Sequence, residues 1–271
     1  MSGRDIRMGR LFGAEGKAVV VACDHGMFDG PHKGMADIPR MLAGLGDGAD
    51  GILLSPGVLP HARGYFGRRG APLAITRINY NSVFAFRWNY GEGVVSHLVT
   101  PQAAATAGAD AVLVCLTLKT GREATDARNA EIFADLCEKA HAIGLPVIGE
   151  YFPARHMTKE PGAFHEEILM GCRMLYELGA DAIKTFYTVK FREVTSTVGI
   201  PVLGLGAEKT PTDREALELA QRETRDGAGG VVFGRNVVQA SKPKSFLAAL
   251  SDVVKRGMTA TAAVKKHGLT G

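Results

Sequence analysis

Short apolar runs alternate along the chain with longer segments that repeat apolar residues at helical spacing. Apolar runs of this kind are typical of strands buried on both faces, as in a parallel sheet that helices cover. Eight of them lie at residues 18–23, 51–55, 72–77, 111–116, 146–150, 181–184, 200–204 and 229–234. Their alternation with helical segments predicts parallel βα units.

The segments between the runs carry helix signals. Thr100-Pro101 and Thr210-Pro211 each predict a helix that begins with proline at its first position. The remaining predicted helices lie at 38–45, at about 124–142, at 164–178 and from about 243 onward. Eight strands, each followed by a helix or by a loop long enough to hold one, predict an α/β fold, the (β/α)8 TIM barrel.

The predicted barrel is a single domain over residues 1–271, with a helical tail at about 258–271. An irregular loop at 78–100 follows the third strand. A long loop after a barrel strand often serves as a lid. The simpler interpretation is that the aromatic residues of this loop pack the loop itself or a subunit contact. They are Phe84, Phe86, Trp88 and Tyr90.

Composition narrows the class of protein. The chain has 271 residues and a net charge of +4, with charges well mixed and no block of Lys and Arg that would indicate nucleic-acid binding. The four cysteines are scattered, without a C-x-x-C pair, and are expected to be buried, reduced thiols of a cytoplasmic protein. No apolar run reaches membrane-spanning length, so no membrane partner is predicted.

Function in a TIM barrel concentrates at the carboxyl ends of the strands. Those ends hold, among others, Asp24, His25, Ser55, Arg77, Thr117, Lys119, Glu150, Tyr151, Lys184 and Tyr187. Lys184 has two interpretations. Its ammonium can reach the rim while its stem stays buried, or its amine can form a Schiff base with a carbonyl substrate. At the barrel mouth, apolar neighbours and nearby cations would favour the neutral, nucleophilic amine.

Two glycine-containing loops follow the last two strands. Gly204-Leu205-Gly206-Ala207 places small residues where backbone N–H groups can approach an anion, and Gly234-Arg235 adds a guanidinium. Together they predict a phosphate site at Gly204, Gly206, Ala207, Gly234 and Arg235. The alternative is a pair of ordinary glycine turns with a surface arginine.

Asp24 and His25 end the first strand. Asp24 can orient a hydroxyl or move a proton, although an aspartate that only orders its loop remains an alternative. His25 is grouped with the substrate-binding residues, while an imidazole hydrogen-bonded within its loop is the simpler interpretation. The eight histidines are dispersed, without an H-x-H or H-x-x-x-H pair, so we predict no metal.

The segments 21–26, 183–188 and 234–239 together resemble the class I, Schiff-base aldolases of the DeoC/LacD/archaeal-type fructose-bisphosphate aldolase superfamily. The resemblance implies that Lys184 is the Schiff-base lysine and that Asp24 orients substrate and handles protons. It implies that Gly206, Gly234 and Arg235 hold the phosphate of a small phosphorylated substrate in carbohydrate metabolism. It further implies that no cofactor is used and that the enzyme is a ring-shaped homo-oligomer, such as a decamer of two pentamers.

Two departures from the family pattern affect the predicted chemistry. Phe152-Pro153 stands where the archaeal-type aldolases carry Tyr-Pro, whose tyrosine is the acid/base. That role can pass to Glu150, to Tyr151 if the strand end is kinked, or to a water. Glu208 replaces the proline of the usual Gly-Gly-Pro-Lys after the seventh strand.

The resemblance leaves other activities open. The same branch holds the autoinducer-2 phosphate thiolase, so acyl transfer on a phosphorylated diketone is one alternative to aldol cleavage. A phosphate-binding isomerase without a Schiff base is another. A barrel that senses a ligand without catalysis is the non-enzymatic alternative.

Overall fold

The computed structural model describes residues 2–154 and 160–270. Within them, parallel strands close into an eight-stranded barrel in the order β1-β10-β9-β8-β7-β6-β3-β2. The predicted barrel and all of its strands are confirmed, with ends shifted by at most two residues. The strands are β1 (Ala18–Ala22), β2 (Gly51–Leu54), β3 (Leu73–Arg77), β6 (Ala111–Leu116), β7 (Val147–Tyr151), β8 (Ala182–Thr185), β9 (Val202–Leu205) and β10 (Gly230–Phe233).

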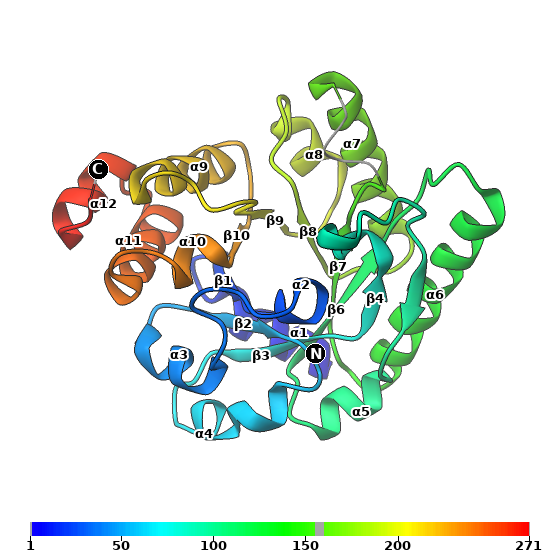
Figure 1. Cartoon of the computed structure of the whole chain (residues 1–271), viewed down its shortest axis with the longest axis horizontal. Helices are drawn as coiled ribbons and strands as arrows, with labels where there is room; N and C mark the ends of the chain where they lie inside the picture. The colour runs from blue at the N-terminus through cyan, green and yellow to red at the C-terminus, as the bar shows by residue number, and fades with distance from the viewer. Residues whose placement is uncertain (1, 155–159, 271) are drawn as a thin grey trace.

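Helices surround the strands, with α6 and α7 on one side and α9, α11 and α12 on the other (Figure 1). Their bounds are α1 (Gly3–Phe12), α2 (Gly26–Asp29), α3 (Ile38–Leu45), α4 (Arg63–Phe66), α5 (Pro101–Thr106), α6 (Glu123–Ala142), α7 (Pro161–Glu177), α8 (Phe191–Thr197), α9 (Asp213–Arg225), α10 (Arg235–Val238), α11 (Pro243–Arg256) and α12 (Ala260–His267). None of these helices combines the length and the apolar character needed to cross a membrane.

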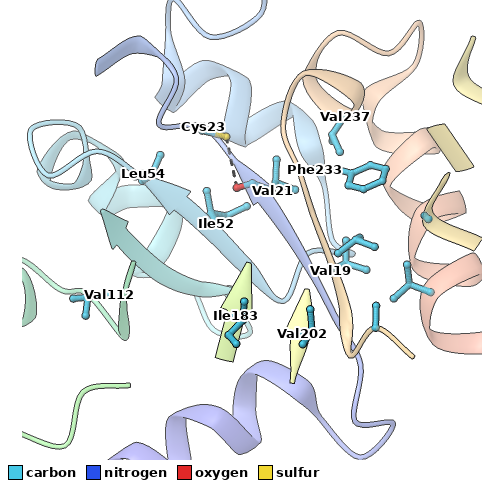
Figure 2. Close-up of a cluster of buried hydrophobic side chains, with 14 of the residues drawn as sticks. Val19, Val21, Cys23, Ile52, Leu54, Val112, Ile183, Val202, Phe233 and Val237 are labelled. Atoms are coloured by element: carbon cyan, nitrogen blue, oxygen red, sulfur yellow. Dashed lines mark hydrogen bonds between the residues drawn. The ribbon is translucent and has the colours of Figure 1, made fainter. Parts of the chain in front are cut away.

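The strands bury both faces, so the core has two layers. Alternate residues such as Ala18 and Val20 of β1 point into the barrel and pack with Leu203 and Val232. Their neighbours Val19 and Val21 belong to the larger layer between barrel and helices, part of which Figure 2 shows. All four cysteines are buried and none forms a disulfide.

The first helix, α1, is absent from the elements that the apolar pattern predicts. Ser2 caps it through a capping box with Asp5, a motif that the sequence contains. Leu11 and Phe12 of this helix join the interior cluster, and Leu11 lies beside Gly51, the first residue of β2. The helix therefore covers the amino-terminal end of the barrel, opposite the end where the strands finish.

Two predicted helix starts are wrong. Helix α9 begins at Asp213, because the side chain of Thr212 accepts a hydrogen bond from the N–H of Glu215 and caps the helix, which leaves Pro211 outside it. Helix α7 begins at Pro161, earlier than predicted, because the Glu160 carboxylate accepts from the first backbone N–H groups. The predicted starts of α5 and α11 are confirmed, with proline in the first turn of each.

The loop at 78–100 contains a short hairpin, β4 (Asn79–Asn81) paired with β5 (Val95–His97), and two 3-10 turns, Ser82–Phe84 and Phe86–Trp88. The Asn79 side chain fixes the hairpin to the barrel, because its amide donates to the carbonyl of Cys115 and accepts from the N–H of the same residue, both at 2.8 Å. The Asn79 side chain thus pairs with the Cys115 backbone as a neighbouring strand would. Hydrophobic periodicity gives no sign of such a contact.

Candidate active site

A cavity of about 700 Å³ opens at the carboxyl ends of the barrel strands. Its wall includes Asp24, His25, Glu150 and Lys184, which the sequence predicts as site residues. They come from three different strand ends, and the closed barrel brings them to one place. Arg77, from the end of β3, lies among them.

Lys184 and Glu150 form the centre of this site. The two residues are register partners on the adjacent strands β8 and β7, so their side chains point to the same side of the sheet. Lys184 Nζ lies 2.5 Å from Glu150 Oε1. Lys184 is 8% exposed and Glu150 is 2% exposed. Besides the apolar residues and the cation expected near the amine, the register places a carboxylate directly beside it.

Arg77 connects both carboxylates of the site. Its Nε donates to Asp24 Oδ2 at 2.6 Å, and its Nη2 lies 2.7 Å from Glu150 Oε2. Its guanidinium lies over the rings of Phe28 and Phe84, with 5.1 and 4.8 Å to the ring centroids. The sequence places Arg77 at a strand end. The residues of that strand do not indicate which carboxylates of other strands its side chain contacts.

These contacts keep the carboxylates charged. Burial opposes ionisation of Asp24, but the guanidinium of Arg77 and the ammonium of Lys184 outweigh it and lower the pKa to about 2. The pKa of Glu150 is lowered for the same reason, with Arg77 and then Lys184 outweighing burial. Burial disfavours the charge of Arg77, yet Glu150 and Asp24 raise its pKa. At neutral pH Asp24 and Glu150 are therefore both ionised, one on each side of the Arg77 guanidinium.

The loops after β9 and β10 meet at one edge of the cavity. Gly206, Ala207, Gly234 and Arg235 all line it. Arg235 Nη2 donates to the Ala207 carbonyl at 3.0 Å, and Asn236 Nδ2 donates to the Gly206 carbonyl at 2.8 Å. The two loops therefore form one unit. Arg235 Nε is buried and has no hydrogen-bond partner among the described residues.

Gly204 does not belong to this loop surface. A Cβ added there would lie 2.2 Å from the carboxyl carbon of Glu223 on α9. Its neighbour Leu203 packs inside the barrel, so alternation turns Gly204 toward the helices. Its prediction as a phosphate-binding residue is therefore wrong.

His25 lines the cavity beneath Gly234. A Cβ on Gly234 would lie 2.5 Å from His25 Cε1 and 2.6 Å from the Ala22 carbonyl oxygen, so this contact requires glycine. Burial lowers the pKa of His25 to about 4, although Asp24 opposes the shift, and the imidazole is neutral at neutral pH. Its Nδ1 finds no hydrogen-bond partner within the described part of the chain.

Tyr151 lies outside the cavity, contrary to its prediction as a catalytic residue. Strand β7 continues through Tyr151 without a kink, so with Glu150 inside, Tyr151 faces the helices. Its ring packs on Gly171 of α7, and its hydroxyl donates to Glu167 Oε1 at 3.4 Å. Burial raises the pKa of this phenol.

Phe152 does line the cavity, at the position where the archaeal-type aldolases carry a tyrosine. Phe84 of the 78–100 loop packs against it, with 4.5 Å between ring centroids. Phe86 also lines the cavity, whereas Trp88 is 63% exposed. Some aromatic residues of the loop therefore pack inside and others border the mouth, and a lid role for the loop stays a prediction. Over residues 2–154 and 160–270, no three His, Cys, Asp or Glu side chains are grouped as metal ligands.

A family model described as DeoC/LacD family aldolase matches residues 18–240. The chain belongs to this family. This aldolase is 34% identical over 262 residues to an uncharacterized aldolase of Saccharolobus solfataricus. The match covers 94% of this chain and 95% of the relative.

Two further relatives carry more specific descriptions. The 3-hydroxy-5-phosphonooxypentane-2,4-dione thiolase of Klebsiella pneumoniae subsp. pneumoniae is 28% identical over 264 residues, 95% of this aldolase and 83% of the thiolase. An archaeal fructose-1,6-bisphosphate aldolase, solved with its catalytic lysine covalently bound to the carbinolamine intermediate of the substrate, superposes with a TM-score of 0.77 and 27% identity. The match covers 92% of this chain and 98% of that chain.

Proposed function

We propose that this aldolase is a class I enzyme in which Lys184 forms a Schiff base with the ketone of a phosphorylated substrate. The observation that carries the proposal is the buried amine of Lys184 at a strand end, with a carboxylate 2.5 Å from it in the cavity of a barrel aldolase. The archaeal relative with its carbinolamine intermediate supports the assignment. An amine is the group that ketones need to become iminium ions.

The reaction begins when Glu150 takes a proton from the Lys184 ammonium, and the free amine adds to the ketone carbon. Loss of water from the carbinolamine gives an iminium. The electrons of the neighbouring C–C bond then flow into the iminium and form an enamine, while the departing carbon becomes an aldehyde. Asp24 accepts the proton that the aldehyde-forming hydroxyl loses. Protonation of the enamine and hydrolysis by water release the ketone and restore Lys184.

The loops after β9 and β10 hold the phosphate in this proposal. Arg235 supplies a guanidinium, and the backbones of Gly206 and Gly234 line the cavity beside it. The neutral imidazole of His25 lies beside Gly234 and is placed to donate a hydrogen bond. Anchoring the phosphate fixes which carbon of the substrate reaches Lys184.

Acyl transfer on a phosphorylated diketone is the second candidate. Phe152 favours it, because a phenylalanine cannot move a proton at a position where aldol cleavage is expected to use one. The thiolase relative supports the same candidate. Both reactions use the Lys184 iminium and the phosphate loops, and they differ in whether an aldehyde or an acyl group leaves.

A cleavage assay separates these candidates. The purified enzyme is given a panel of phosphorylated ketoses and phosphorylated diketones, with and without a thiol acceptor. We expect cleavage of at least one member and loss of essentially all activity in Lys184→Arg, which keeps the charge but not the nucleophile. Partial activity in Lys184→Arg would instead indicate an isomerase-like enzyme in which the lysine acts only as a charge.

We further propose that the enzyme needs no metal and works as a cytoplasmic homo-oligomer. The iminium supplies the electron sink that a Lewis acid would otherwise provide, so dialysis against a chelator is expected to leave activity unchanged. Light scattering of the purified protein tests the oligomer, and a monomer at working concentration would contradict it. Fractionation of cells tests the compartment, and recovery outside the cytoplasmic fraction would contradict that part.

A further inference from the structure

Five phenylalanines line the cavity, and we call them the aromatic wall. They come from segments far apart in the sequence: Phe28, Phe84, Phe86, Phe152 and Phe186. Each ring contacts the next one along the wall. The centroid distances are 4.6 Å for Phe28–Phe84, 4.5 Å for Phe84–Phe152 and 5.2 Å for Phe152–Phe186. Phe86 joins through Phe152 at 6.1 Å. The wall is therefore one continuous apolar surface.

Three members of the aromatic wall, Phe84, Phe86 and Phe152, lie away from the phosphate loops, whereas Phe28 and Phe186 follow β1 and β8, the strands beside β10 and β9. Phe84 and Phe86 follow β3, and β3 stands across the barrel from β9 in the strand order β9-β8-β7-β6-β3. Lys184 ends β8, between the β9 loop and Phe152 at the end of β7. A substrate with its phosphate on the β9 and β10 loops and its ketone on Lys184 therefore extends its remaining carbons toward the aromatic wall.

Those remaining carbons become the aldehyde when the C–C bond breaks. A polyol or a second phosphate placed against phenyl rings would lose hydrogen bonds to water, and the rings themselves offer none in return. An alkyl or aryl group would instead gain from removing its apolar surface and that of the rings from water. The aromatic wall thus favours an aldehyde without charge and with few hydroxyls.

We propose that the aldehyde partner of this aldolase carries an apolar alkyl or aryl group. The inference rests on the proposed Schiff-base function and adds the chemical class of the second substrate. In the synthetic direction, the enamine carbon of the donor attacks the aldehyde carbon, the aldehyde oxygen takes a proton, and water hydrolyses the new iminium. The water released when the Schiff base forms balances the water consumed when it is hydrolysed.

Arg87 offers the main counterargument, because it lines the cavity from the same loop and is a cation. It is exposed at the rim, whereas Phe84 and Phe152 are 5% and 6% exposed. An aldehyde with a phosphate would have to place that group at Arg87 while its carbons cross the phenyl rings. A comparison of charged and apolar aldehydes decides between an apolar partner at the aromatic wall and a phosphorylated partner at Arg87.

The experiment uses dihydroxyacetone phosphate as donor and measures kcat/KM for phenylacetaldehyde, isobutyraldehyde and glyceraldehyde 3-phosphate. We expect the better of the two apolar aldehydes to exceed glyceraldehyde 3-phosphate by about tenfold or more, as contacts of a few carbons in an apolar pocket provide. Phe86→Ser should lower that ratio several-fold. Trp88→Ser is the matched control, because Trp88 lies on the same loop, is exposed and does not line the cavity; it should leave the ratio unchanged.

Trapping with borohydride distinguishes a failure of the proposed Schiff-base function from a failure of the apolar aldehyde partner. If dihydroxyacetone phosphate is trapped on Lys184 but glyceraldehyde 3-phosphate is the better aldehyde, the proposed function stands and the apolar partner is wrong. The same holds if Arg87→Ala abolishes the reaction of glyceraldehyde 3-phosphate while Phe86→Ser changes no ratio. If no donor is trapped on Lys184, the proposed function fails and this inference fails with it.

Discussion

Glu150 Oε1 lies 2.5 Å from Lys184 Nζ, and the two residues face each other because β7 and β8 pair them in register. In the proposed mechanism this contact gives the amine a base within hydrogen-bond reach, because Phe152 cannot accept a proton. Arg77 holds the opposite oxygen of the same carboxylate. One oxygen of the carboxylate therefore faces the Arg77 guanidinium and the other faces the Lys184 amine.

Glu150→Gln removes the base and keeps the shape of the side chain. We expect kcat to fall about 10²- to 10³-fold, because general-base catalysis contributes on that order. The rate of Schiff-base formation, followed by quenching with borohydride at short times, should fall in parallel. A matched control is Glu218→Gln, because Glu218 is a half-buried glutamate on α9 that does not line the cavity. Unchanged trapping kinetics in Glu150→Gln would show that Glu150 does not carry the proton.

Arg77→Met tests the buried charge network. The substitution leaves Asp24 and Glu150 buried without their shared cation, so the free energy of unfolding at neutral pH should fall by about 3–5 kcal/mol. Urea denaturation measures the loss. Arg68→Met is the control, because Arg68 pairs with the exposed Asp47 at the surface, and it should change stability by less than about 0.5 kcal/mol. Equal effects of the two substitutions would mean that the network contributes nothing specific.

Glu223 provides a pH prediction away from the active site. Its carboxyl is fully buried beside Gly204, and neither oxygen has a hydrogen-bond partner among the described residues. Burial raises its pKa well above the ordinary value of 4.5, so the folded state keeps a proton that the unfolded state loses. The stability that this group contributes is present below that value and declines as pH rises.

The comparison is Glu223→Gln against the native protein. Above the ordinary pKa of glutamate, the stability of the variant relative to the native protein should increase with pH by up to about 1.4 kcal/mol per pH unit. Urea denaturation at several pH values between about 5 and 8 follows the difference. A difference that stays constant over this range would show that Glu223 is ionised in the folded protein.

Gly234→Ala tests the phosphate loops. The added Cβ would lie 2.5 Å from His25 and 2.6 Å from the Ala22 carbonyl, so the loop after β10 must shift. We expect KM for a phosphorylated substrate to rise about tenfold or more, while trapping of an unphosphorylated ketone changes little. Gly64→Ala is the control, because a Cβ there meets no atom within 4 Å. A rise in KM that is equal for both ketones would place the phosphate elsewhere.

The sequence predicts the barrel well because each strand is a short apolar run between helices, and such runs need no partner to be recognised. The positions of Lys184 and Glu150 inside the mouth follow from alternation along single strands. Alternation also places Tyr151 and Gly204 outside the cavity once the strand ends are known. A single sequence does not locate those ends to the residue. Arg77 could not be assigned, because its partners lie on strands far away in the chain.

The most direct measurement is reduction with borohydride in the presence of dihydroxyacetone phosphate, followed by peptide mass mapping. The account predicts a stable adduct of the ketone on Lys184, and no adduct in Lys184→Arg or without borohydride. An intact, folded enzyme that cleaves a phosphorylated substrate but gives no adduct on Lys184 with any phosphorylated ketone would contradict it.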